Sequence, residues 1–197
     1  MLPGDRPSDD PSGGWEAIAH DFAAARSDIG TDVVLRWSRD LPCGAAILDI
    51  GCGTGRPIAR ALADAGFALS GVDASPSLLA AFRHNLPGAE ATCEAVQTSR
   101  FFDRRFDAAI AIGLIFLLDE ADQHALFHRV RGALHPGGRF LFSAPRQACT
   151  WSDNLTGRVS RSLGEAAYRR ALAAARFHPT GSDVDAGENH YIAAVAV

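Results

Sequence analysis

The chain has 197 residues, of which 47% are hydrophobic and 21% are charged, and its formal net charge is -4 at pH 7. This length and composition are typical of one globular domain with a buried core. The negative net charge gives no general attraction to nucleic acid, and the apolar stretches are too short to span a bilayer. We therefore expect neither nucleic acid nor a membrane as a partner, while the oligomeric state stays open.

The cysteines and the N-terminal segment bear on the cellular compartment. The four cysteines are widely separated and form no CxxC pair, which is typical of reduced thiols rather than of a disulfide framework or a zinc site. No metal is expected. Residues 1–14 are rich in Pro, Gly, Asp and Ser and lack the basic start and apolar middle of a secretory signal, so they predict a flexible leader. Together these features predict a cytoplasmic protein.

Residues 15–197 are predicted to form one domain, which begins with a helical cap over residues 15–41. In this cap, apolar side chains recur on both sides of Gly30, as expected of two helices that are broken near that glycine.

The rest of the chain alternates between short apolar runs and helical patterns. The spacing predicts helices from Pro57 to Gly66, after Ser75-Pro76, and from Asp119 to the turn His135-Pro136-Gly137-Gly138. Residues 147–160 are predicted as a polar, irregular loop and residues 163–177 as a helix. The runs that predict strands are residues 45–50, 67–72, 91–96, 106–112, 139–144 and 191–197, with a weak one at 182–185. This alternation predicts an α/β fold with helices on both faces of a sheet.

The most informative motif is the sequence ILDIGCGTG at residues 47–55, where the first strand meets its helix. Glycine at positions 51, 53 and 55 allows a tight turn and lets a ligand approach backbone amides near a helix N-terminus. Asp73 follows eighteen residues after Gly55, at the end of the second strand. A carboxylate there accepts hydrogen bonds from both hydroxyls of a ribose. The two motifs together predict a nucleoside pocket at the carboxyl ends of parallel strands.

These motifs resemble those of the class I methyltransferases, whose first motif is an acidic residue followed by GxGxG. The resemblance covers roughly residues 45–145. It implies a doubly wound, mostly parallel seven-stranded sheet with an antiparallel C-terminal strand, and an enzyme that uses S-adenosyl-L-methionine and releases S-adenosyl-L-homocysteine. In the family, the residue after the second strand holds the ribose, and residues after the third strand flank the adenine. The cofactor-binding residues that it implies are Asp49, Gly51, Cys52, Gly53, Gly55, Asp73, Ala74, Glu94, Ala95, Gly113 and Leu114.

Two alternatives remain open at this point. An NAD(P)-dependent Rossmann oxidoreductase also has glycines after the first strand and an acidic residue after the second, although its GxGxxG differs from the GxGxG followed by Arg56 and Pro57 found here. The other alternative is a Rossmann-like domain that binds the cofactor without catalysis.

The expected reaction is methyl transfer to a nucleophilic O, N or S atom of an acceptor. Because a sulfonium methyl group is already activated, a general base is needed only where the acceptor must lose a proton. The candidates for that base are His20, Asp153, His190 and Tyr191, none of which lies in a decisive motif.

Three regions are expected to shape the acceptor pocket: the N-terminal cap, the loop around residue 151 and residues 188–191. Their candidate contacts are Trp15, Arg26, Trp151, Asp153 and His190. Trp15 fits a packing role in the cap equally well, and Arg26 either pairs with the cofactor carboxylate or faces solvent. The loop with Trp151 and Asp153 is expected to border the acceptor rather than the adenosine, because it leaves its strand at the carboxyl end of the sheet. The short chain favours a small-molecule acceptor, whose identity stays open.

Overall fold

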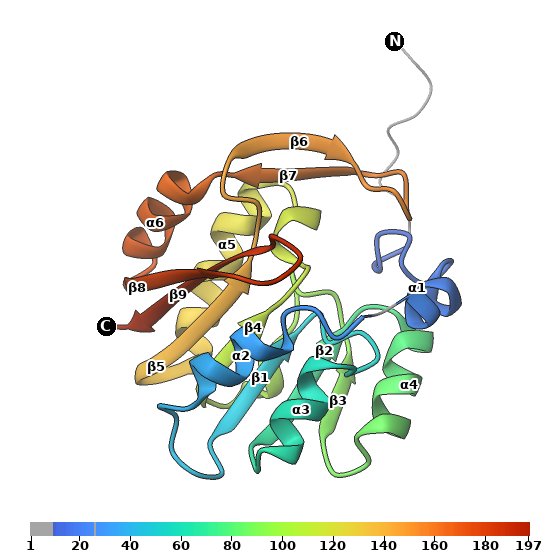
Figure 1. The fold of residues 1–197 in the computed structure, drawn as a ribbon, viewed down its shortest axis with the longest axis horizontal. Coiled ribbons are helices and arrows are strands. Elements are labelled where there is room, and N and C mark those ends of the chain that lie inside the picture. The colour runs from blue at the N-terminus through green and yellow to red at the C-terminus, as the bar shows by residue number, and fades with distance from the viewer. Residues whose placement is uncertain (1–9, 26) are drawn as a thin grey trace.

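A computed structural model of the chain describes residues 10–25 and 27–197 (Figure 1). Seven strands form the main sheet in the order β3-β2-β1-β4-β5-β9-β8. These strands are β1 (Ala46–Ile50), β2 (Ala68–Asp73), β3 (Glu90–Cys93), β4 (Phe106–Ala111), β5 (Leu134–Ser143), β8 (Phe177–Val184) and β9 (His190–Ala196). Strands β1 to β5 pair in parallel, and β9 pairs antiparallel with β5 and β8. The expected fold class is confirmed.

Helices cover both faces of this sheet (Figure 1). They are α1 (Ala19–Ala25), α2 (Thr31–Ser38), α3 (Ile58–Asp64), α4 (Pro76–Asn85), α5 (Glu120–Ala133) and α6 (Glu165–Ala174), with short 3-10 helices η1 (Phe101–Asp103) and η2 (Ile115–Leu117). Alternate residues of β1 pack into different apolar clusters: Ile47 lies with α2 and α3, whereas Leu48 lies with α5 and α6. A strand that is covered on both faces has no polar side, which explains its continuous apolar run.

Side-chain caps fix two of the helix starts that the sequence predicts. The Oγ atom of Ser75 accepts a hydrogen bond from Leu78 N at 3.2 Å, and Pro76 occupies the first turn of α4. Asp119 Oδ1 likewise accepts from Asp122 N at 2.8 Å at the start of α5. In each case the side-chain oxygen satisfies a backbone N–H that has no partner within the helix. The capping residue therefore fixes where the helix begins.

The predicted loop over residues 147–160 is wrong. Strands β6 (Ala148–Ser152) and β7 (Val159–Leu163) pair antiparallel as a separate two-stranded sheet, which spans one end of the molecule in Figure 1. Strand β6 is largely exposed, and the buried side chains of β7 are Ser160 and Ser162. An exposed strand beside one that buries serine has no apolar alternation, so periodicity gives no sign of this hairpin.

Several element boundaries also differ from the predictions. Strand β3 stops at Cys93, three residues before the expected end, and helix α6 stops at Ala174, so that the alanine-rich pattern ends before β8 begins. Strand β8 is longer than the weak strand expected at residues 182–185. Little in the sequence indicates the longer strand, because most of its residues are polar or small rather than large and apolar. Residues 135–138 lie inside β5 as an irregularity in its pairing with β4, where a separate turn was expected.

The N-terminal segment departs from the expected leader over residues 10–14. Ser12 N and Gly14 N donate to the Asp10 carboxylate at 2.9 and 2.7 Å, and Ser12 is buried. An aspartate that accepts following backbone N–H groups forms a local turn, and composition does not reveal this. Residues 1–9 of the predicted leader, and Arg26, lie outside the described residues. Among the residues described, none of the helices has the length and apolar character needed to cross a bilayer.

Candidate active site

The turn after β1 is built by the three glycines of the ILDIGCGTG motif. Gly53 has a φ of 52°, and its N–H donates to Asp73 Oδ2 at 2.8 Å, which ties the turn to the end of β2. Gly55 has a φ of 74°, and a Cβ atom there would clash with Leu86 Cδ1. Both positions therefore require glycine, the first for its backbone conformation beside Asp73 and the second for close packing against the end of α4.

Asp73 is the charged group at the centre of this turn. Its Oδ2 atom accepts from Gly53 N, and its Oδ1 atom accepts from Ser75 N at 2.9 Å. Burial raises the pKa of the Asp73 carboxyl, although these backbone hydrogen bonds favour its ionised form. A carboxylate has about four acceptor positions, so two remain for groups in the space above the turn.

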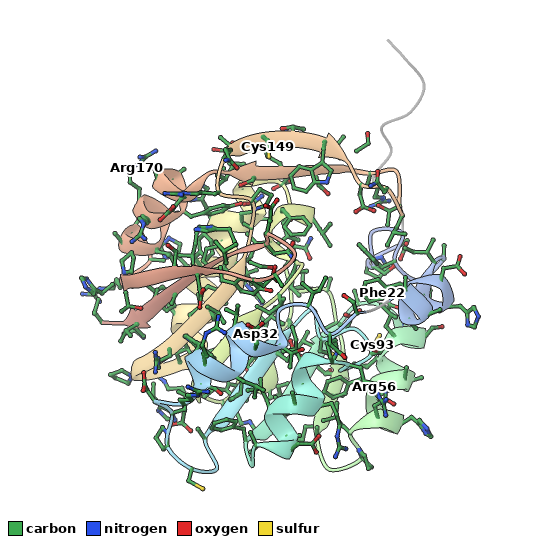
Figure 2. The ribbon with its side chains drawn as sticks, in the orientation of Figure 1. Phe22, Asp32, Arg56, Cys93, Cys149 and Arg170 are labelled. Carbon is green, nitrogen blue, oxygen red and sulfur yellow. The ribbon has the colours of Figure 1, made fainter. Side chains whose placement is uncertain are left out.

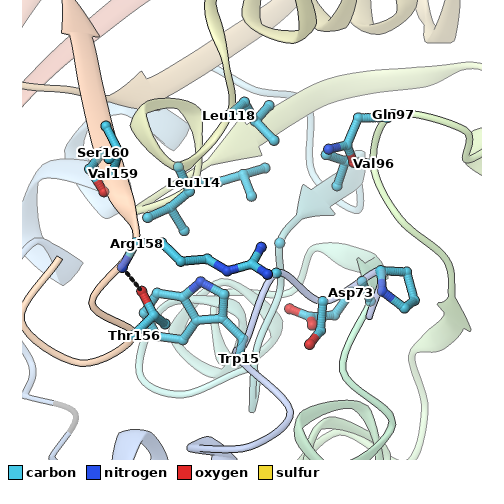
Figure 3. A pocket seen from close by; sticks show the side chains of 16 residues that line it. Trp15, Asp73, Val96, Gln97, Leu114, Leu118, Thr156, Arg158, Val159 and Ser160 are labelled. Carbon is cyan, nitrogen blue, oxygen red and sulfur yellow. Dashed lines mark hydrogen bonds between the residues drawn. The ribbon is translucent and has the colours of Figure 1, made fainter. Parts of the chain in front are cut away.

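Two neighbouring cavities open at this turn and share Trp15, Gly51, Asp73, Leu114 and Leu117 in their walls. We call the first the Gln97 cavity, because it extends past Val96 and Gln97 (Figure 3). The second is the Cys52 cavity, which extends past Cys52, Thr54 and Gly113. Together they form one cleft along the carboxyl ends of β1, β2 and β4.

Most of the residues that the sequence assigned to the cofactor line this cleft. Gly51, Asp73 and Leu114 line both cavities, Ala74 lines the Gln97 cavity, and Cys52, Gly53 and Gly113 line the Cys52 cavity. The remaining four, Asp49, Gly55, Glu94 and Ala95, line neither cavity. The sequence did not single out Gln97, Leu117 or Leu118, which also line the cleft; their only signal is that they follow the third and fourth strands.

Glu94 lies just beyond β3 and carries a buried oxygen. Its Oε1 atom accepts from Thr92 Oγ1 at 3.2 Å, whereas its Oε2 atom has no hydrogen-bond partner among the described residues. A buried carboxylate oxygen without a donor is costly, so this position fits a ligand that supplies an N–H group.

The N-terminal segment closes the cleft from the outside. The Glu16 carboxylate accepts from the Ser75 and Ser77 hydroxyls and from Ser77 N at 3.0 Å, so it caps the start of α4. These hydrogen bonds, that from Ser75 first, lower the pKa of Glu16. Trp15 and Phe22 meet edge to face, with ring centroids 5.0 Å apart, and both line the Cys52 cavity. The structure thus places Trp15 against the glycine turn.

The hairpin of β6 and β7 forms the opposite wall. Its tip, residues 156–160, lines the Gln97 cavity, and the Arg158 side chain extends into the space beside Trp15 (Figure 3). Trp151 pairs across the hairpin with Ser160, and its ring lies with Phe116 at a centroid distance of 5.4 Å. Trp151 does not line the cleft, whereas residues of the same hairpin, including its cross-strand partner Ser160, do; the assignment of Trp151 to the acceptor stays a prediction.

Trp151 and Phe116 line a third cavity, which we call the Trp151 cavity. Its other walls include Ser143, Arg146, Asn189 and His190, at the carboxyl end of β5 and the start of β9. A hydrogen bond connects its wall with the cleft, because Gly113 N donates to Ser143 Oγ at 2.8 Å. Gly113 lines the Cys52 cavity and Ser143 lines the Trp151 cavity, so the two spaces adjoin at this bond.

His190 is the titratable group buried in the wall of the Trp151 cavity. Its side chain is 6% exposed, its Nε2 atom lies 3.6 Å from Glu165 Oε2, and its Nδ1 atom is buried without a partner among the described residues. Burial lowers the pKa of His190, and the nearby Glu165 carboxylate opposes this shift. The lowered pKa favours the neutral form of the imidazole.

The other candidate bases line none of these three cavities. Asp153 Oδ1 accepts from Thr156 N at 2.7 Å and holds the hairpin turn. The Tyr191 hydroxyl donates to Asp185 Oδ2 at 2.8 Å, and His20 is exposed on α1. Of the predicted acceptor contacts that the structure describes, Trp151 and His190 are brought together in one cavity, and Arg26 lies outside the described residues. No cluster of His, Cys, Asp or Glu that would hold a metal ion occurs in the described part of the chain.

Comparison with known proteins agrees with this geometry. Residues 47–138 match a family model described as a methyltransferase domain. Comparison with curated proteins gives no significant sequence match. Residues 47–138 thus match a methyltransferase domain, and the sheet order and the solved structures described below show a methyltransferase-like fold. A dinucleotide-binding sheet has the order 3-2-1-4-5-6 without an antiparallel strand inserted beside the fifth, so the oxidoreductase alternative is not supported.

Solved structures of methyltransferases share the fold. The CcbJ methyltransferase from Streptomyces caelestis has a TM-score of 0.74 and 17% identity, covering 98% of this chain and 100% of that one. The glycopeptide N-methyltransferase MtfA bound to S-adenosyl-L-homocysteine has a TM-score of 0.72 and 21% identity, with coverage of 89% and 95%. CalS10, an amino pentose methyltransferase from Micromonospora echinaspora, has a TM-score of 0.69 and 20% identity, with coverage of 91% and 92%.

Proposed function

We propose that this chain is a class I methyltransferase, which transfers the methyl group of S-adenosyl-L-methionine to an O, N or S atom of a small molecule held in the Trp151 cavity. The observation that carries the proposal is the hydrogen bond between Gly113 N and Ser143 Oγ, which is 2.8 Å long. It joins a cleft built from the glycine turn and Asp73 to a cavity that contains an aromatic pair and a buried histidine.

The cleft fits the cofactor residue by residue. Asp73 has acceptor positions left for the two ribose hydroxyls, and the unpartnered Oε2 atom of Glu94 suits the amino group of adenine. Gly51 and Gly53 present backbone rather than side chains to the amino-acid portion. Cys52, Ala74 and Leu114 would complete the walls, while Asp49 and Gly55 would support the turn from beneath; Ala95 lines neither cavity but precedes Val96, which does. When bound, the cofactor supplies a methyl group on a positively charged sulfur, which is already a good leaving group.

The protein's own part in the reaction is to position the acceptor and exclude water. Trp15 and Phe22 would cover the cleft on one side, and the hairpin tip would cover it on the other. Trp151 and Phe116 would orient the acceptor toward Gly113. For an acceptor that must lose a proton, the neutral imidazole of His190 is the group that would accept it, because a base must be unprotonated to act.

The described elements and the structural neighbours support a small acceptor. Beside the main sheet and its covering helices, the described residues form the hairpin and the N-terminal segment, which favours a small molecule over a macromolecule that needs an added recognition surface. Two similar structures are named as a glycopeptide N-methyltransferase and an amino pentose methyltransferase. Both names support an acceptor of small or moderate size, and a nitrogen atom as one acceptor to test first.

We also propose that residues 15–197 act as one domain in the cytoplasm. The main sheet draws its strands from residue 46 to residue 196, which supports a single folding unit. All four cysteines are free, and Cys43, Cys93 and Cys149 are exposed, the last two on separate parts of the molecule (Figure 2). Exposed free thiols persist in a reducing compartment, which supports the location.

The test has two stages. In calorimetry and thermal unfolding, S-adenosyl-L-homocysteine should bind and raise the melting temperature, whereas NAD and NADP at the same concentration should not. Transfer is then followed with S-adenosyl-L-methionine carrying a labelled methyl group, across small amines, thiols, phenols and carboxylates. Binding without transfer to any of these classes would favour the non-catalytic alternative, and preferential stabilisation by NAD would refute the proposed cofactor.

A further inference from the structure

A fourth cavity lies at the opposite end of the sheet from the cleft. It lies between residues 98–105, which lead into the amino end of β4, and the last turn of α5, which precedes β5. Its walls contain four arginines, Arg100, Arg104, Arg105 and Arg129, and we call it the arginine cavity. This clustering stands out in a chain whose formal net charge is -4.

The charges around this cavity do not balance. Arg100 pairs with Asp103, which also lines the cavity, at 2.8 Å, and Arg104 pairs with Glu90 at 2.6 Å. Arg105 donates only to the carbonyl oxygen of Leu134, at 3.3 Å, and Arg129 donates to the carbonyl oxygen of Ser99. Four guanidinium groups against two carboxylates leave two positive charges, on Arg105 and Arg129, with no carboxylate within ion-pair distance among the described residues.

The Arg129 side chain is held in place and still lacks an acceptor. Its guanidinium lies over the ring of Phe101, 5.4 Å from the centroid, and Phe101 is buried. Its Nε atom is buried without a hydrogen-bond partner among the described residues. A guanidinium presents donors in a rigid fork that matches the oxygens of a carboxylate or phosphate, so one anion oxygen near Nε would remove an uncompensated donor.

The cavity has room for a compact anion. A Cβ atom built on Gly132, in the last turn of α5, would meet nothing within 4 Å. The hydroxyl groups of Thr98 and Ser99 also line the space and supply polar contacts. Because Arg105 and Arg129 both line this open cavity and lack a carboxylate partner among the described residues, each can donate to a different oxygen of one tetrahedral anion, whereas a planar carboxylate is bound by a single arginine.

We propose that the arginine cavity binds a phosphate group, either as a free ion or carried by a small organic molecule. Arg105 and Arg129 supply the charge, and the hydroxyls of Thr98 and Ser99 supply further hydrogen bonds. The site is separate from the cofactor cleft, and the proposal does not depend on methyl transfer. Strand β4 connects the two ends of the sheet, since it begins beside the arginine cavity and ends at Ala111, two residues before Gly113 in the wall of the cleft.

The experiment titrates wild-type protein calorimetrically with inorganic phosphate, pyrophosphate and glycerol phosphate, with sodium chloride at matched ionic strength as the reference. Saturable binding of at least one phosphate compound is expected, and comparison of the three distinguishes a free ion from a phosphate ester. Arg105→Gln should weaken that binding by about tenfold, as loss of a charged hydrogen-bond donor does. Arg60→Gln, at an exposed arginine of α3 outside this cavity, should leave it unchanged.

Two further measurements keep the result interpretable. Arg129→Lys retains the charge but loses the fork, so it should bind more weakly than wild type and more tightly than Arg129→Gln. S-adenosyl-L-homocysteine should bind equally well to wild type and Arg105→Gln, which separates this site from the cleft and confirms that the variant is folded. An absence of saturable binding to wild type, or equal binding by Arg105→Gln and Arg60→Gln, would overturn the proposal.

Discussion

The most direct test of the cleft is the replacement of Asp73 by alanine. Each carboxylate oxygen of Asp73 accepts one backbone N–H, from Gly53 at 2.8 Å and from Ser75 at 2.9 Å. One acceptor position therefore remains on each oxygen for a ribose hydroxyl. A hydrogen bond to a charged group contributes about 1.5 to 3 kcal/mol. The variant would lose two such bonds to the ribose, and water that enters the space left by the side chain would offset part of that loss. We expect affinity for S-adenosyl-L-homocysteine to fall by about 1.5 to 3 kcal/mol, or about 12- to 160-fold in Kd.

The assay is isothermal titration calorimetry, with thermal unfolding to verify that each variant is folded. Asp119→Ala is the matched control, because Asp119 also accepts a backbone N–H, from Asp122 at 2.8 Å, but lies outside the cleft. It should lose about 1 kcal/mol of stability as a helix cap and keep its affinity. Asp73→Asn retains the size of the side chain and one acceptor, so its affinity for S-adenosyl-L-homocysteine should be intermediate between those of Asp73→Ala and Asp119→Ala. Unchanged affinity in a folded Asp73→Ala protein would refute the assignment of Asp73 to the ribose.

Three further predictions concern the acceptor, the base and the glycine turn. Trp151→Ala should lower turnover or acceptor affinity, while the free energy of S-adenosyl-L-homocysteine binding stays within about 0.5 kcal/mol of wild type. Trp15→Ala, in the cleft, should weaken that binding. Loss of cofactor affinity in folded Trp151→Ala would contradict the division of the site. Because burial lowers the pKa of His190 below its ordinary value of 6.5, turnover of an acceptor that must lose a proton should fall only as the pH drops below that value, and His190→Asn should remove this limb of the pH profile. A profile that is unchanged in His190→Asn would exclude the imidazole as the base. In chemical denaturation, Gly55→Ala should destabilise the fold by about 1 to 3 kcal/mol more than Gly66→Ala. Both glycines have a positive φ, but of the two only Gly55 would clash if it carried a Cβ atom. Equal losses of stability would show that packing against Leu86 is not the reason for glycine at position 55.

The parts of the fold that sequence reasoning predicted are those where apolar burial and turn chemistry act locally. Strand β4 reads FDAAIA because both of its faces are covered, with Ala109 in one apolar cluster and Ile110 in the other. Ser75 and Asp119 predict the starts of helices because a capping oxygen must lie just before the first turn. The glycine turn and Asp73 were predictable for the same reason, since each is required by contacts within a few residues or between adjacent strands.

The hairpin was not predictable from periodicity, because polar contacts attach it to the rest of the protein. The buried side chain of Gln123, on α5, donates from Nε2 to Leu118 O at 2.9 Å and to Arg161 O, in β7, at 3.0 Å. Its Oε1 atom accepts from the Tyr168 hydroxyl at 3.0 Å. Ser162, on the buried side of β7, donates to Pro145 O at 2.6 Å. Such a network holds a strand without any apolar alternation, and its partners are distant in sequence.

This mode of attachment also explains why the acceptor side of the site was harder to predict than the cofactor side. The glycine turn and Asp73 lie on the sheet, whose geometry is fixed by strand pairing, so residue type and spacing determine what they contact. Trp151 reaches Phe116 only because the hairpin folds back over η2, and the same hairpin brings residues 156–160 to the cleft. One insertion therefore forms walls of both spaces. Substitutions in the hairpin can change which acceptor fits beside Trp151, while the main sheet and the cofactor-binding residues on it keep their structure.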